Sequence, residues 1–138
     1  MDGIVNWWDY LSSRWDLVGA TLMETIIYVV TVTVSAGVLA IVTGILTRNR
    51  PFAKEMSLAI ASVFLTIPSL ALFTIFIPLV GLGFAPSFIA LFLYAILPIL
   101  RNTVTGLDSV DPSVLESARG MGLTKSQVLL QVQLPLAW

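Results

Sequence analysis

Residues 56–100 contain no charged side chain, and this run constrains the fold of the chain more than any other feature. As one helix the run would be about 65 Å long, roughly twice the thickness of the hydrocarbon core of a bilayer. It must therefore fold back on itself, and residues 80–86, with two glycines and a proline, form its turn-like point. The run thus predicts two membrane spans, at about 56–80 and 84–100, joined by an uncharged hairpin.

A further apolar stretch precedes this run. No charge lies between Glu24 and Arg48, which leaves enough residues for one more crossing, placed at about 21–47. Small residues on one face of this span permit close packing of another helix, although a face that lines a transport path is an alternative. They are Ala36, Ala40, Thr43 and Gly44. We therefore predict an all-α integral membrane protein with three complete transmembrane helices.

The composition supports a membrane protein and excludes several kinds of chemistry. The chain is 57% hydrophobic and 11% charged, whereas soluble domains carry about 25% charged residues. It has no cysteine and no histidine, which excludes disulfides, thiolate chemistry and the common zinc sites. No basic tract indicates nucleic-acid binding. We expect no cofactor, no metal and no catalytic residue.

The distribution of basic residues predicts the orientation. One crossing separates Glu24 from Arg48 and two crossings separate Lys54 from Arg101, so six of the seven basic residues share a side. That side is predicted to be the cytoplasm of a multi-pass plasma-membrane protein, with the N-terminus outside. Residues 1–20 mix aromatic and acidic side chains, and we interpret them as an extracytoplasmic amphipathic lead-in. The six basic residues are Arg48, Arg50, Lys54, Arg101, Arg119 and Lys125.

A proline in the middle of the second span predicts a bend. Pro68 cannot donate a hydrogen bond to the carbonyl four residues back, and the hydroxyls of Thr66 and Ser69 can satisfy freed backbone groups. These three residues are a candidate gate or substrate contact. A simple packing kink is an equally weighted alternative.

A polar segment, residues 111–138, follows the last span. Asp111 and Pro112 are typical of a helix start, and Gly122 of a helix end. Residues 124–127 read as a capping box that opens a second helix, which Pro135 is expected to interrupt. The first helix has an apolar stripe of Val114, Leu115, Ala118 and Met121. The segment is thus predicted to be two short helices with a sharp bend at 122–123, presented to a cytoplasmic partner; an ordinary interfacial helix pair is the alternative.

The spacing of this segment resembles the EAA signature of ABC importer permeases. That signature reads Glu-Ala-Ala, three residues, Gly, nine residues, Ile-x-Leu-Pro, and the chain departs from it only by mild size changes at Ser117 and Val132. Residues 66–72 and 94–103 resemble the osmoprotectant branch, the permeases for glycine betaine, carnitine and choline. The matching residues are Glu116, Ser117, Ala118, Gly122, Val132, Leu134 and Pro135.

The resemblance implies a function without covalent chemistry. In type I importers this segment is the coupling helix, which docks into a cleft of the cytoplasmic ATPase subunit. Glu116 would then lie at the interface, Ser117 and Ala118 would allow close packing, and Gly122 would provide the bend. The other implied partners are an extracytoplasmic substrate-binding protein and a second permease subunit, identical or different.

The resemblance also implies a longer protein. Permeases of this family continue beyond the Leu-Pro of the signature into a core of five spans, whereas this sequence stops at Trp138. We therefore expect residues 21–138 to be a C-terminally truncated permease domain. An inactive remnant that acts only as a small membrane interaction protein is an alternative. Half of a secondary transporter is a third interpretation. It is disfavoured because secondary transporters usually carry ionisable residues in the membrane, whereas the predicted spans of this chain carry none between residues 26 and 46 or 56 and 100.

Overall fold

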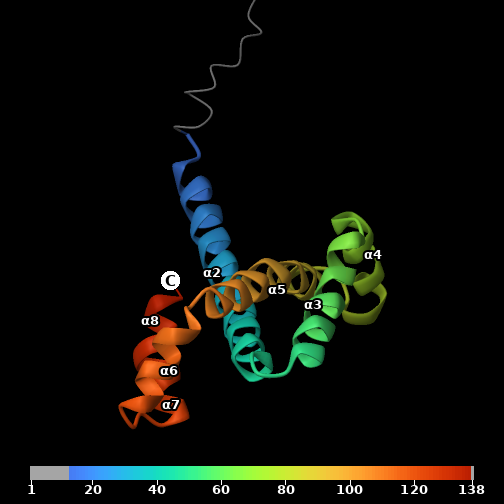
Figure 1. Cartoon of the computed structure of the whole chain (residues 1–138). Coiled ribbons are helices and arrows are strands. Elements are labelled where there is room, and N and C mark those ends of the chain that lie inside the picture. Colours follow the sequence, from blue (N-terminus) through green and yellow to red (C-terminus); the bar gives the residue numbers. More distant parts are fainter. Residues whose placement is uncertain (1–12, 138) are drawn as a thin grey trace, which may run out of the picture.

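The computed structural model describes residues 13–137, and this part of the chain is helical with short connections (Figure 1). Residues 1–12, most of the predicted lead-in, lie outside it. Four longer helices come first: α2 (Trp15–Thr47), α3 (Pro51–Thr66), α4 (Ser69–Val80) and α5 (Phe84–Asp108). The polar segment follows as α6 (Pro112–Gly120), α7 (Lys125–Gln127), the π-helical turn η1 (Val128–Gln133) and α8 (Leu134–Leu136).

Helix α5 crosses α2, and the small residues of α2 lie at that crossing (Figure 1). Ala36 and Ala40 have no exposed surface, and Gly44 is buried. A Cβ atom on Gly44 would lie 2.8 Å from the Thr103 Cγ2 atom of α5, closer than carbon atoms pack. The small face therefore allows the two helices to approach closely, as the sequence predicts.

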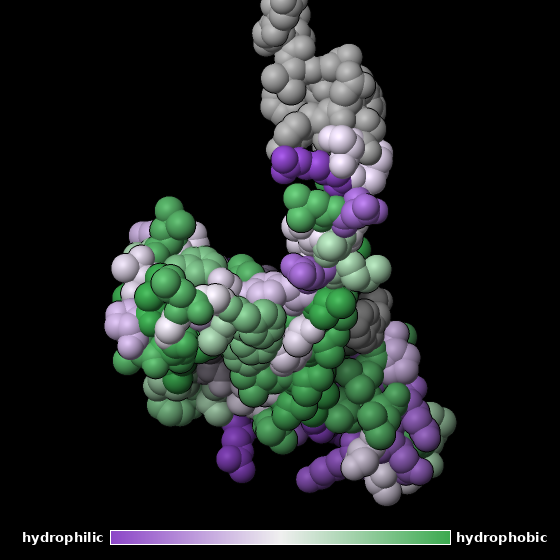
Figure 2. All heavy atoms as spheres, turned by 180° about the vertical axis from the view of Figure 1, so that it is seen from behind, coloured by the Kyte–Doolittle hydropathy of each residue, from purple (hydrophilic) through white to green (hydrophobic). Residues whose placement is uncertain are grey.

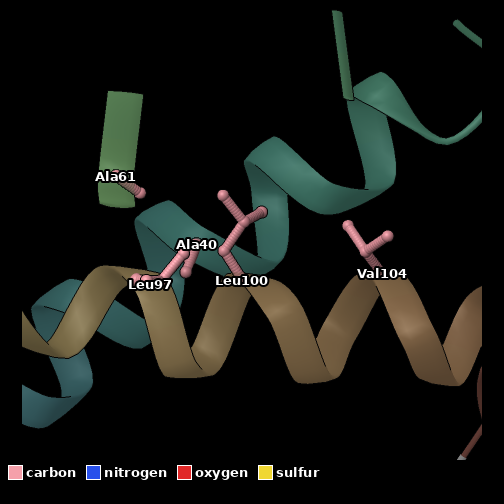
Figure 3. Close-up of a cluster of buried hydrophobic side chains, with 5 residues drawn as sticks. All are labelled: Ala40, Ala61, Leu97, Leu100 and Val104. Atoms are coloured by element: carbon pink, nitrogen blue, oxygen red, sulfur yellow. The ribbon is translucent and has the colours of Figure 1, made fainter. Parts of the chain in front are cut away.

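A cluster of buried apolar side chains joins three helices. Ala40 of α2 and Ala61 of α3 face α5 (Figure 3). Their partners on α5 are Leu97, Leu100 and Val104. Leu100 is 1% exposed and lies at the centre of the labelled group. Helix α5 is thus the element against which α2 and α3 are both packed.

The predicted bend at Pro68 is a complete break. Helix α3 ends at Thr66, α4 begins at Ser69, and their axes differ by 93°. Ile67 has extended backbone angles, which agrees with the steric restriction that a proline imposes on the residue before it. Residues 56–80 are therefore two helices and not one continuous bent helix.

The predicted hairpin after this pair is confirmed. Helix α4 ends at Val80, and Gly81 and Gly83 have φ angles of +83° and +122°. Glycine adopts such angles without the steric cost of a Cβ atom. Pro86 lies in the first turn of α5. A backbone N–H has no partner within the helix at this position, so the proline removes no helical hydrogen bond. The reversal brings α4 and α5 side by side.

Two of the described helices, α2 and α5, are each long and apolar enough to cross a membrane. The bent pair of α3 and α4 is a third candidate, either as a broken span or as a re-entrant loop. Large apolar side chains cover the outside, for example Leu70, Leu79 and Leu82 at 73–86% exposure. Figure 2 shows this apolar surface in the middle of the molecule, with hydrophilic groups above and below it. Such a surface fits a lipid environment.

Candidate functional site

Helix α6 begins as predicted. The Ser113 backbone N–H donates to Asp111 Oδ1 over 2.8 Å, and Pro112 occupies the first helical position. The backbone N–H and then the hydroxyl of Ser113 stabilise the charged carboxylate, which lowers the pKa of Asp111 below its ordinary value. This cap fixes the start of the polar segment three residues after α5 ends.

Gly122 ends the same helix, also as predicted. Its φ angle is +88°, in the left-handed region. The Leu123 N–H donates to the Ala118 carbonyl over 3.3 Å, and the Gly122 N–H donates to the Arg119 carbonyl over 2.9 Å. These two bonds form a Schellman motif, which turns the chain sharply. The predicted bend at 122–123 is therefore present.

The capping box that opens the second helix of the polar segment is confirmed, but the predicted interruption of that helix at Pro135 is not. Gln127 and Thr124 exchange hydrogen bonds between side chain and backbone at 2.9 and 3.4 Å. The chain then stays helical from Lys125 to Leu136, so Pro135 does not interrupt it. The π-helical turn η1 precedes the proline, and the Leu134 N–H donates to the carbonyl five residues back. A wider turn displaces the carbonyl with which the proline ring would otherwise clash.

The two faces of α6 differ in exposure. Ala118 is 2% exposed, and α6 packs there against η1, where Val128 is buried. Glu116 and Ser117 are exposed; the Ser117 hydroxyl donates to the Ser113 carbonyl over 2.8 Å. Within the described part of the chain, the Glu116 carboxylate has no hydrogen-bond or ion-pair partner. It is therefore available to a group outside the chain.

The predicted apolar stripe is narrower than expected. Ala118 is buried and Leu115 is half-buried, but Val114 is 38% exposed and Met121 is 74% exposed. Met121 is the C-cap residue just beyond the last helical residue, Gly120, at the start of the turn. The bend consequently presents an apolar side chain at its tip.

The fold brings both halves of the EAA-like signature into one unit. The residues of its first half lie on α6, and Gly122 forms the exposed turn. Val132 on η1 and Leu134 on α8 are half-buried, while Pro135 on α8 is exposed. Packing of α6 against η1 thus places residues that are far apart in the sequence within one small subdomain.

The candidate gate has one member that the sequence did not identify. The Thr66 hydroxyl donates to the Val63 carbonyl over 2.7 Å, while the exposed Ser69 has no side-chain hydrogen bond in the described part of the chain. Instead, the Tyr94 hydroxyl of α5 donates to the Ile67 carbonyl at the break. Only the helix crossing reveals this contact, because one tyrosine in an apolar span carries no positional signal.

Tyr94 also lines a wide-open cavity of about 310 Å³ formed by residues of α2 and α5. The lining is apolar except for the hydroxyls of Tyr94 and Thr33. The remaining lining residues are Val29, Val32, Leu91 and Ala95. The break and this cavity therefore share one side chain.

Comparison with known proteins decides the family. Residues 36–138 match the family described as binding-protein-dependent transport system inner membrane component. The chain belongs to this family. The match includes α3 to α8 and the C-terminal part of α2, residues 36–47, so the break, the hairpin and the polar segment all lie inside the family region. The permease family expected from the EAA-like spacing is thereby confirmed.

The similar curated proteins are osmoprotectant permeases. The carnitine transport permease protein of Listeria monocytogenes is 46% identical over 96 residues, 70% of this chain and 44% of that protein. The choline transport system permease protein of Bacillus subtilis is 45% identical over 93 residues, 67% of this chain and 42% of that protein. The osmoprotectant import permease protein of Salmonella typhimurium is 46% identical over 93 residues, 65% of this chain and 39% of that protein. The chain thus spans less than half of the length of each relative.

Proposed function

We propose that the chain is a permease subunit of an ATP-driven importer for compatible solutes of the glycine betaine, choline and carnitine type. Its family membership supports a role in binding-protein-dependent transport. The names of its relatives, which specify carnitine, choline and osmoprotectant transport, support the substrate class. The subunit itself binds no nucleotide and performs no covalent chemistry; ATP hydrolysis belongs to a partner.

The proposed topology has three spans, α2, the α3–α4 pair and α5, as part of a five-span core in the plasma membrane. Residues 1–20 form the extracytoplasmic lead-in, and residues 21–138 belong to the transmembrane domain. The ion pair between Lys54 Nζ and Asp108 Oδ2, 2.7 Å long, supports a shared end for the start of α3 and the end of α5. The excess of basic residues at that end supports a cytoplasmic assignment.

Residues 111–135 are the proposed coupling segment. The observation that carries this assignment is the division of α6 into a buried face at Ala118 and an exposed face, on which Glu116 has no partner among residues 13–137. A surface helix whose inner face is fixed and whose outer carboxylate is free suits docking into a cleft of a soluble subunit. The turn at Gly122 exposes Met121 beside it, which adds an apolar contact for the same cleft.

Three partners follow from this proposal. A cytoplasmic ATPase binds the coupling segment, an extracytoplasmic binding protein delivers the solute, and a second permease subunit, identical or different, completes the pathway. Thr66, Pro68 and Ser69 form the proposed gate at the α3–α4 break, where α4 can change its angle to α3 without breaking helical hydrogen bonds.

Substitution of Glu116 by Ala tests the proposal. The permease is co-expressed with the ATPase and binding-protein subunits of the importer, and recovery of the ATPase with the permease is measured together with uptake of radiolabelled glycine betaine, choline and carnitine. We expect Glu116→Ala to reduce both. Glu55→Ala is the matched control, because Glu55 is an exposed carboxylate outside the coupling segment. Equal ATPase recovery and equal uptake in the two variants would refute the coupling role.

A further inference from the structure

The polar segment leaves α5 and then returns to it. Residues 109–111 connect α5 to α6, the chain turns at Gly122, and the second half of the segment comes back to the end of α5 (Figure 1). There the Gln133 side-chain amide donates to the Leu107 carbonyl over 3.1 Å. The segment is therefore attached to α5 at two points, one covalent and one through this hydrogen bond.

The acceptor in this contact is a carbonyl that needs a partner. Leu107 lies in the last turn of α5, where the four terminal carbonyls have no partner within the helix. Leu107 is 3% exposed, so water has little access to it. An unsatisfied carbonyl in such a position is costly. Gln133 supplies the missing donor from a half-buried position on η1.

A second observation places Ala137, the residue that follows α8, against the same turn. A Cβ atom on Gly106 would lie 2.5 Å from the Ala137 carbonyl oxygen, so the backbones approach as closely as a glycine permits. Beside this contact lies a cavity of about 300 Å³, lined by Leu107, Leu134 and Ala137 together with residues of α2 and α5. The junction between α5 and the returning segment is therefore not continuously packed, and the close approach at Gly106 and the hydrogen bond from Gln133 both lie next to this cavity.

We infer that Gln133 is a positioning residue that transmits movement of the coupling segment to α5. This inference rests on the proposed function, and it adds a residue at the unspecified position of the Val-x-Leu-Pro part of the signature. When the ATPase displaces α6, the packing of α6 on η1 carries the movement to Gln133, and the hydrogen bond to Leu107 carries it to α5. Helix α5 then moves α2 and α3, which are packed on it.

The test separates transmission from docking. Gln133→Met keeps the length and volume of the side chain and removes its N–H donor. Gln131→Met is the matched control, because Gln131 is exposed on the same turn and makes no side-chain hydrogen bond in the described part of the chain. The complete transporter is reconstituted in liposomes, and uptake of radiolabelled glycine betaine, ATP hydrolysis and ATPase recovery are measured together.

We expect Gln133→Met to reduce the solute transported per ATP hydrolysed by about fivefold, the factor that corresponds to one interhelical hydrogen bond of about 1 kcal/mol. ATPase recovery should remain as in the wild type, and Gln131→Met should change neither quantity. Gly106→Ala should lower the same ratio, whereas Gly37→Ala, whose added Cβ has no atom within 4 Å, should not.

Each other outcome overturns the inference. An unchanged ratio in Gln133→Met shows that the contact transmits nothing. A parallel loss of ATPase recovery and transport at constant ratio shows that Gln133 acts on docking instead. These failures differ from a failure of the proposed function, which would appear as equal ATPase recovery in Glu116→Ala and Glu55→Ala.

Discussion

Replacing Tyr94 by Phe removes a single hydroxyl from the contact between α5 and the α3–α4 break. The Ile67 carbonyl accepts a hydrogen bond from that hydroxyl. Within the described residues it accepts no backbone hydrogen bond, because the first helical bond of α4 runs from the Leu72 N–H to the Pro68 carbonyl. Leaving a buried carbonyl unsatisfied costs about 1–3 kcal/mol in soluble proteins, whereas interhelical hydrogen bonds in membranes average about 0.6 kcal/mol. Both groups here are half-buried, so we expect Tyr94→Phe to lower the free energy of unfolding by about 1 kcal/mol.

The assay is reversible unfolding of the purified protein in mixed micelles by increasing SDS, followed by circular dichroism. Tyr28→Phe is the control, because the Tyr28 hydroxyl also reaches a carbonyl across helices, that of Phe84, but over 3.4 Å and at an exposed site. Its ring contact with Phe84, at 4.7 Å between centroids, survives the substitution. Equal losses of stability in the two variants, or no loss in Tyr94→Phe, would refute the assignment of Tyr94 as the partner of the broken backbone.

Two further predictions concern the helix crossing and the start of the polar segment. Gly44→Ala should cost about 1–3 kcal/mol of unfolding free energy in the same titration, because its Cβ would overlap the Thr103 side chain, whereas Gly37→Ala has open space around it and should be near neutral. A comparable loss at both positions would contradict close packing as the cause. Asp111→Ala should speed hydrogen exchange of the first amides of α6, while Asp111→Asn should keep the cap. The pKa of Asp111 in the folded protein is lowered from 3.8. The carboxylate therefore stabilises α6 fully above pH 3.8, and this stabilisation is lost as the pH falls through the pKa of the folded protein. An inflection of the Ser113 amide NMR shift at or above pH 3.8 would contradict this.

Much of the local structure follows from short-range chemistry in the sequence. The caps at Asp111 and Thr124 and the turn at Gly122 each depend on residues within a few positions of one another, which is why all three are predictable. The same holds for the break after Ile67, which a proline imposes directly. The size of that break, 93°, is not predictable from the proline alone, because it depends on how α4 packs on α5.

The expectations that failed concern contacts and backbone adjustments that residue type and spacing do not specify. Val114 and Met121 have apolar side chains at helical spacing, and yet both are exposed. The spacing does not predict how much of α6 is in contact with η1. Pro135 is tolerated inside a helix because the π-helical turn before it widens the backbone. The residue types in this turn do not predict a π-helical conformation.

The uncharged run of residues 56–100 indicates by itself that the chain lies in a membrane and reverses near Gly81, because a charge in lipid is costly and a helix of that length exceeds the bilayer. The sequence also determined the family, because the signature consists of residue types at fixed spacing along the chain. Only the tertiary structure decided which side chains serve the backbone where helices are broken or end. Tyr94 at Ile67 and Gln133 at Leu107 each satisfy a carbonyl 26 or 27 residues away along the chain. Such pairs form where helices cross, and the crossing is set by the summed packing of whole faces rather than by any local pattern.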